Sequence, residues 1–328
     1  MTWLTWRQSR ILFLAAITAL AIIALAYGLT APGLNHLYAR YGTHPAEFLT
    51  QVKTGSYPVL YFAGCAVMYL TPLVIGAFWG APLIARELET GTNRLVWNQS
   101  VSRTRWLLAK LAIGGGAAMA FAGITGLLLS WWAGPIDRAG GLPVGTSQLS
   151  RFEPIVFGTR GIVPIGAAAL AFMIGVCAGL LLRRVIPAMA VTLGLLTALL
   201  VAMPLAVSPH LITPAQYTRP VTANLTTMTM SSNGEFNDPV TGMPGAWILT
   251  DQIITRTGAV FTMPDVPACA TGTQAQCDGW LAAQPLRQHV VYQPAGRYWT
   301  FQILETAIWL AIALALAGLS SRRIRTIG

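Results

Sequence analysis

The chain has 328 residues, of which 54% are hydrophobic and only 10% are charged, with a formal net charge of +10. Its mean hydropathy is +0.58. Soluble domains contain about 25% charged residues, so these values exclude a single water-soluble globule. Long stretches carry no charge, and about 20 apolar residues suffice to cross a bilayer. The sequence therefore predicts an all-α polytopic membrane protein.

Six apolar segments are long enough to span a membrane. In chain order they cover 11–29, 54–85, 111–134, 161–182, 185–207 and 299–321. The second contains Pro58, Pro72 and Pro82, which predicts a long, kinked or tilted helix. Residues 1–10 indicate a short N-terminal amphipathic helix at the headgroup level, or a charged end that only sets topology. We expect the first span to be retained, since its apolar run exceeds that of a cleavable signal peptide.

Basic residues are distributed unevenly between the two sides of the predicted topology. With the N-terminus inside, the cytoplasmic side holds twelve of the Lys and Arg residues and only Glu87 and Glu89 as acids. The positive-inside rule then places both termini in the cytoplasm of a multi-pass cell-membrane protein. The basic excess is thereby explained as a topology signal, and no nucleic-acid partner is expected.

The loops differ greatly in length. The outer segment 208–298 is rich in Pro, Thr, Gly and Asn, with 226–230 as a possible strand. It is long enough for a small folded extracellular cap, although its composition predicts no clear helix. We expect one transmembrane domain over 1–328, which includes this cap loop and a longer cytoplasmic segment, 86–110.

The segment 86–110 joins the second and third spans. Gly91 is suited to the left-handed residue that ends a helix, and Thr92 to the N-cap of a short helix that follows. Ser100 or Ser102 is suited to cap the third span. The short helix would present an apolar surface to the cytoplasm, formed by Leu95, Val96 and Trp97. An exposed apolar surface in a basic setting indicates a docking site for another protein.

This segment resembles the signature of the type-2 ABC exporter permeases, particularly the actinobacterial group. In that family Glu-x-Glu-x-Gly-Thr, a short helix, Ser-Arg and a Lys connect spans two and three. The matching residues here are Glu87, Glu89, Gly91, Thr92, Ser102, Arg103 and Lys110. The plan of the whole chain agrees as well, with six spans and a large outer loop before the last.

The resemblance implies a function for the segment. The short helix would be a coupling helix, with Leu95, Val96 and Trp97 in a groove of a separate ABC ATPase subunit. Glu87 and Glu89 would join an ion-pair network near that subunit. Two copies of the permease, expected to form a homodimer, would enclose the translocation path. ATP and Mg would bind to the ATPase and not to this chain.

Catalytic motifs do not occur in the sequence. It contains no Gly-x-x-x-x-Gly-Lys-[Ser/Thr] phosphate-binding loop, no His-Glu-x-x-His and no Gly-x-Ser-x-Gly. The four histidines lie on predicted outer loops without ligand spacing. We therefore expect neither an enzyme nor a metal site, and no cofactor bound by this chain.

Other residues carry more than one interpretation. Cys269 and Cys277 lie in the outer loop, where an oxidising compartment favours a disulfide, or they are two free thiols. Glu305 is the one acid well inside an apolar span. It could contact a cationic substrate in the translocation path, pair with a basic residue, or reach the membrane interface. Aromatic residues near the outer ends of spans indicate an interfacial belt, formed by Trp131, Trp132, Tyr298 and Trp299.

These observations predict the membrane-spanning subunit of an ATP-driven exporter. Two alternatives remain. An ion-coupled secondary carrier would need several intramembrane acids or broken helices near the midplane. A membrane-anchored sensor or assembly protein would act through the 208–298 loop and would need no ATPase.

Overall fold

The structure is a computed structural model of the chain. It describes residues 2–91, 102–144, 147–221, 229–230, 236–237, 243, 245–261, 273, 276, 279–280 and 283–326. Most of this part is helical, as predicted, and its strands lie between the spans.

Six helices of the described part are long and apolar enough to cross a membrane, which confirms the predicted number. The spans are built from α1 (Thr2–Tyr41), α3 (Tyr57–Val74) with η1 (Ile75–Gly80) and α4 (Ala81–Glu89), α6 (Arg103–Trp132), α9 (Val163–Leu182), α10 (Val185–Ala202) with η2 (Met203–Val207) and η3 (Ser208–His210), and η5 (Ala295–Arg297) with α13 (Tyr298–Thr326). The other elements are α2 (Pro45–Thr54), α7 (Gly134–Arg138), β1 (Leu142–Val144), β2 (Ser147–Leu149), α8 (Pro154–Phe157), β3 (Ala215–Pro220), β4 (Thr229–Met230), β5 (Phe236–Asn237), β6 (Trp247–Ile254) and β7 (Arg287–Gln293).

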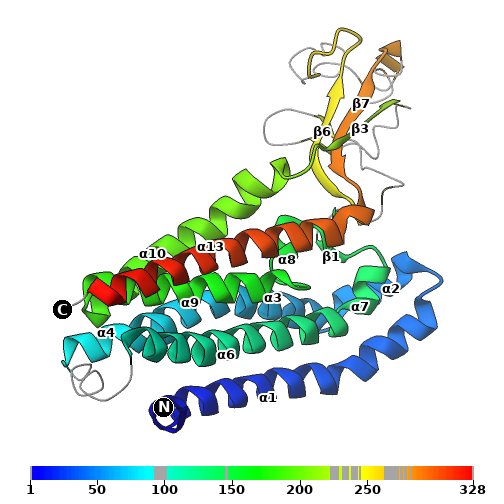
Figure 1. The fold of residues 1–328 in the computed structure, drawn as a ribbon. Coiled ribbons are helices and arrows are strands. Elements are labelled where there is room, and N and C mark those ends of the chain that lie inside the picture. Colours follow the sequence, from blue (N-terminus) through cyan, green and yellow to red (C-terminus); the bar gives the residue numbers. More distant parts are fainter. Residues whose placement is uncertain are drawn as a thin grey trace.

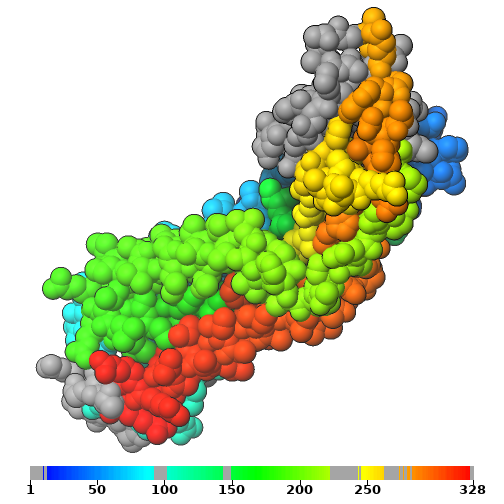
Figure 2. All heavy atoms as spheres, turned by 90° about the horizontal axis from the view of Figure 1, so that it is seen from above, coloured from blue at the N-terminus to red at the C-terminus, as the bar shows by residue number. Residues whose placement is uncertain are grey.

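The spans lie lengthwise in one bundle (Figure 1). Both chain termini and α4 lie at one end of the bundle, which we call the terminus end, and β3, β6 and β7 rise from the other, the sheet end. Figure 2 shows that α10 and α13 form much of one long face, with the sheet beyond its end. The described parts of the segment, 86–91 and 102–110, and both ends of the chain therefore share one end, as the predicted topology requires.

The first helix differs from its prediction in two ways. The expected short N-terminal amphipathic helix is not a separate element, because α1 runs without a break from Thr2 to Tyr41. No Gly or Pro stands near Arg10 to interrupt it. The helix also continues past Leu29 through Pro32, and Leu34 beyond that proline is fully buried in the core.

The second span is helical but irregular, which agrees with its predicted prolines. Pro82 has no N–H to donate to the carbonyl of Phe78. Immediately before it, η1 is a π-helix, in which the Ala81 N–H bonds to the Gly76 carbonyl. Such wider turns are uncommon and occur often at functional sites.

The centre of the bundle is α9, whose side chains are buried along most of its length. Small residues let its backbone approach the second span closely. A Cβ added at Gly179 would lie 2.7 Å from the Ala81 carbonyl oxygen, and one at Gly80 would lie 2.5 Å from the Phe172 carbonyl oxygen. On α6, Gly114 lies against the Phe172 ring in the same way. The packing of α4 on α9 is thus set by backbone contact and leaves no room for larger side chains.

The segment between the last two spans contains an antiparallel sheet with the strand order β3-β7-β6. Ala215 pairs with Tyr292, and Trp247 with Gln293. The predicted strand at 226–230 is present at β4, and 226–228 lie outside the described residues. Trp247 packs on Phe152 and Phe301, with ring centroids 5.8 and 6.1 Å away. This tryptophan anchors the sheet to the helical bundle.

Candidate functional site

The two ends of the segment 86–110 have the predicted local structure. Gly91 has a φ of +71°, the left-handed conformation that glycine adopts at little cost, directly after the end of α4. Ser102 is the N-cap of α6, and its hydroxyl accepts the Arg105 N–H at 3.3 Å. Arg103 is the first residue of α6. Four predicted site residues lie outside the described residues, namely Thr92, Leu95, Val96 and Trp97.

A buried ion pair joins α4 to α6. The Lys110 ammonium group donates to the Glu87 carboxylate and, at 3.4 Å, to the Leu83 carbonyl. It also lies 4.6 Å from the centre of the Trp106 ring. Lys110 is 5% exposed. A buried charge is tolerated only when it is paired. Because Lys110 needs these partners, its contacts hold α4 and α6 together.

Glu89 makes a different contact from Glu87. Its carboxylate accepts the backbone N–H of Val185 at 3.0 Å, at the start of α10. The first N–H groups of a helix have no partner within the helix, and the helix dipole favours an anion there. The two glutamates of α4 therefore hold two different helices, α6 and α10, at the terminus end.

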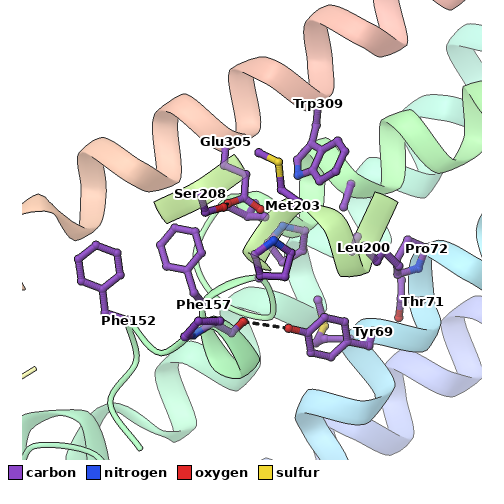
Figure 3. A pocket seen from close by; sticks show the side chains of 18 of the residues that line it. Tyr69, Thr71, Pro72, Phe152, Phe157, Leu200, Met203, Ser208, Glu305 and Trp309 are labelled. Carbon is purple, nitrogen blue, oxygen red and sulfur yellow. Dashed lines mark hydrogen bonds between the residues drawn. The ribbon is translucent and has the colours of Figure 1, made fainter. Parts of the chain in front are cut away.

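Glu305 lies toward the sheet end and inside the bundle. It is 5% exposed, and the Ser208 hydroxyl donates to its carboxylate at 3.0 Å. The side chain is therefore enclosed by the bundle, and its position relative to the membrane interface stays a prediction. Glu305 is buried because it lies on the side of α13 that is turned into the bundle. Trp309, one turn further along α13, points inward as well (Figure 3).

A small cavity adjoins the Glu305 carboxylate. Its volume is about 30 Å³, which is room for a water molecule or two. The walls come from α3, α8, α9, η2, α13 and the base of β6. Tyr69 donates to the Pro154 carbonyl at 3.1 Å across one side (Figure 3). The Trp309 indole lines the cavity beside Glu305 (Figure 3). A carboxylate in such surroundings attracts a small cation or a polar group.

Replacing Ser208 by alanine is expected to destabilise the protein by about 1–3 kcal/mol, because the buried Glu305 carboxylate loses a hydrogen-bond donor. The free energy of unfolding in mixed detergent micelles measures this. Ser321→Ala is the control, since the exposed Ser321 hydroxyl donates to the Gly318 carbonyl of its own helix and its loss should change stability by less than about 0.5 kcal/mol. Equal effects of the two changes would contradict the assigned hydrogen bond.

The predicted disulfide is not placed by the structure, because Cys269 and Cys277 lie outside the described residues. It stays a prediction. The two other cysteines are free thiols inside the bundle. Cys65 accepts the Thr159 hydroxyl at 3.6 Å, and Cys177 lies 3.0 Å from the Ser320 hydroxyl.

Sequence analysis missed an ion pair at the sheet end. Arg160 donates to Asp137 at 3.0 Å, although 23 residues separate the two along the connection between α6 and α9. Burial raises the pKa of the Asp137 carboxyl, against the opposite effects of the Arg160 and Arg151 guanidinium groups. The only sequence signal was a set of opposite charges near span ends, which predicts no specific pairing.

The family profile described as "ABC-2 membrane transporter related" matches residues 12–208. The match extends from the first span to the end of the fifth and includes Glu87, Glu89, Gly91, Ser102 and Lys110. Glu305 and most of the 208–298 segment lie beyond it. No curated protein and no solved structure matches the chain. Because the profile covers more than half of the chain, the protein belongs to the ABC-2 membrane transporter related family and is a multi-pass membrane subunit of an ABC transporter.

Proposed function

We propose that this chain is the membrane-spanning subunit of an ATP-driven exporter, moved by separate ATPase subunits that dock on the segment 86–110. The observation that carries the proposal is the attachment of α4 to two other helices through Glu87 and Glu89. A displacement of the segment would move α4, α6 and α10 together. ATP and Mg would bind to the ATPase partner, which the family implies.

The close packing of α4 on α9 supports a rigid transmission of that displacement. Backbone contacts at Gly80 and Gly179 leave no space for sliding side chains. The π-helical η1 belongs to this rigid part and connects it to α3. Bending where α3 meets η1 would let η1 and α4 move with α9 as a body, which is a hinge motion of the kind used in switching proteins.

A translocation path would lie between two copies of the chain, as a homodimer in the cell membrane with both termini in the cytoplasm. The basic residues at the terminus end support this orientation. Apolar side chains of α3, η1 and α10 are exposed in one copy and would face the second copy or lipid, among them Leu70, Phe78, Ile186, Val191 and Leu195. The Glu305 cavity would be part of the path.

Co-purification tests the docking step. ABC ATPase subunits are co-expressed with the tagged chain one at a time, and bound ATPase is measured after purification in mild detergent. We expect an ATPase to bind and Leu95→Asp/Trp97→Asp to reduce its recovery at least about tenfold, since a buried apolar contact becomes a buried charge.

The matched control is Tyr217→Asp/Val260→Asp, which changes one aromatic and one aliphatic exposed residue at the sheet end. It should leave recovery unchanged. Equal loss in both variants, or substrate movement driven by an ion gradient without any ATPase, would contradict the proposal and favour a secondary carrier.

A further inference from the structure

An open pocket lies at the sheet end, where α6 ends and α13 begins. Its volume is about 660 Å³. Its charged walls are Asp137, Arg138, Arg151 and Arg160, and we call it the arginine pocket. Three arginines face one carboxylate, so the pocket has an excess of positive charge. Neither the family match nor the proposed coupling route assigns it a role.

Arg160 lies at the bottom of the arginine pocket and is 1% exposed. One of its nitrogens, Nη1, donates to Asp137. Its Nε and Nη2 are buried, and the guanidinium lies against Tyr61, 4.8 Å from the centre of the ring. Buried guanidinium donors are normally satisfied. Arg160 therefore contributes positive charge beneath the floor of the pocket, where one of its nitrogens is bonded to the Asp137 carboxylate.

The two exposed arginines at the mouth are held by aromatic rings. The Arg151 guanidinium lies 4.5 Å from the centre of the Tyr298 ring, and that of Arg138 lies 4.8 Å from the Tyr38 ring. Stacking on a ring orients the planar guanidinium group and leaves its N–H donors free for a ligand. A phosphate or carboxylate can accept two parallel hydrogen bonds from one guanidinium group. The mouth is thus preorganised for an oxyanion.

The pocket also has apolar walls, where the span α6 ends and the span α13 begins. Trp131 and Trp299 line it and are 58% and 56% exposed. They fit the predicted interfacial belt, whereas Trp132 and Tyr298 are buried and do not, because they occupy the inward faces of the same helices. One turn further into the spans, exposed Leu127 and Ile303 continue these two faces.

We propose that the arginine pocket binds the phosphate group of an anionic amphiphile, whose acyl chains lie along the outer faces of α6 and α13. The guanidinium groups of Arg138 and Arg151 contact the phosphate, and Arg160 adds charge from below. This inference does not depend on an ATPase partner, so its test stands apart from that of the proposed function.

Ligand binding to the full chain in neutral detergent tests the inference. Dioctanoyl phosphatidylglycerol, dioctanoyl phosphatidylcholine and inorganic phosphate are the probes, and bound ligand is measured by native mass spectrometry. We expect phosphatidylglycerol to bind at least about tenfold more tightly than phosphatidylcholine, whose choline is repelled by the arginines. Equal binding of the two lipids would overturn the proposal. Inorganic phosphate that binds as tightly as phosphatidylglycerol would assign the site to a free anion and overturn the lipid part.

Variants of the exposed arginines locate the binding without disturbing the core. Arg138→Gln/Arg151→Gln is expected to weaken phosphatidylglycerol binding at least about tenfold, the effect of losing charge-assisted hydrogen bonds. Arg40→Gln/Arg287→Gln removes the same charge from two other exposed arginines and should change binding less than about twofold. If both double variants lose the same affinity, the lipid is bound by general surface charge and the pocket assignment is wrong.

Discussion

Replacing Lys110 by methionine is expected to destabilise the protein by about 3–5 kcal/mol, the usual consequence of removing one partner of a buried ion pair. The change leaves the Glu87 carboxylate between α4 and α6 with no cation. One of its oxygens, Oε2, already has no hydrogen-bond partner in the described part of the chain. The free energy of unfolding in mixed detergent micelles is the measurement.

A second variant separates charge from packing. Glu87→Leu/Lys110→Met removes both charges, and replacing a whole buried pair by apolar side chains is often nearly neutral. We expect this double variant to lie within about 2 kcal/mol of the wild type. Lys53→Met is the matched control, because Lys53 is the other lysine of the chain and is exposed. If Lys110→Met were no more destabilising than Lys53→Met, the pair would not be a buried contact.

The double variant also tests the coupling route. It keeps the helices folded but replaces the ion pair between α4 and α6 with an apolar contact. If the pair transmits movement from the ATPase, ATPase binding persists while transport per ATP hydrolysed falls. Unchanged transport would leave the pair with a purely structural role.

Sequence patterns predicted the spans and the local ends of the coupling segment because both depend on nearby residues. A run of about 20 apolar residues between charges is a local signal. The roles of Gly91 and Ser102 are local too, since each serves the helix next to it. In contrast, the contact of Glu89 with Val185 joins residues from different spans, and no local pattern specifies it.

Burial inside the bundle could not be predicted for a related reason. A span is apolar on all sides, so its sequence does not show which face is turned inward. Glu305 was therefore left with three possible environments, and Trp132 was assigned to the same belt as Trp131. The sheet was missed because β3 pairs with β7 across some 70 residues of chain, a non-local contact between segments rich in Pro and Thr.

Gly175→Ala is expected to destabilise the protein by at least about 3 kcal/mol, at the upper end of the range for overpacking. A Cβ on Gly175 would overlap the Gly76 carbonyl oxygen and lie 2.7 Å from the Ala81 nitrogen. Both are backbone atoms, so no side chain can turn away to make room. The second span would have to separate from α9 along η1 and α4, with loss of the close packing that holds helices together in lipid.

Gly194→Ala on α10 is the matched control, because nothing lies within 4 Å of the position that its Cβ would occupy. Both substitutions gain the same helix propensity, about 1 kcal/mol, so the difference between them measures the steric contact alone. We expect Gly194→Ala to be neutral or slightly stabilising. Similar unfolding free energies for the two variants would mean that α9 and η1 are not in backbone contact, and the rigid transmission from the terminus end would lose its structural basis.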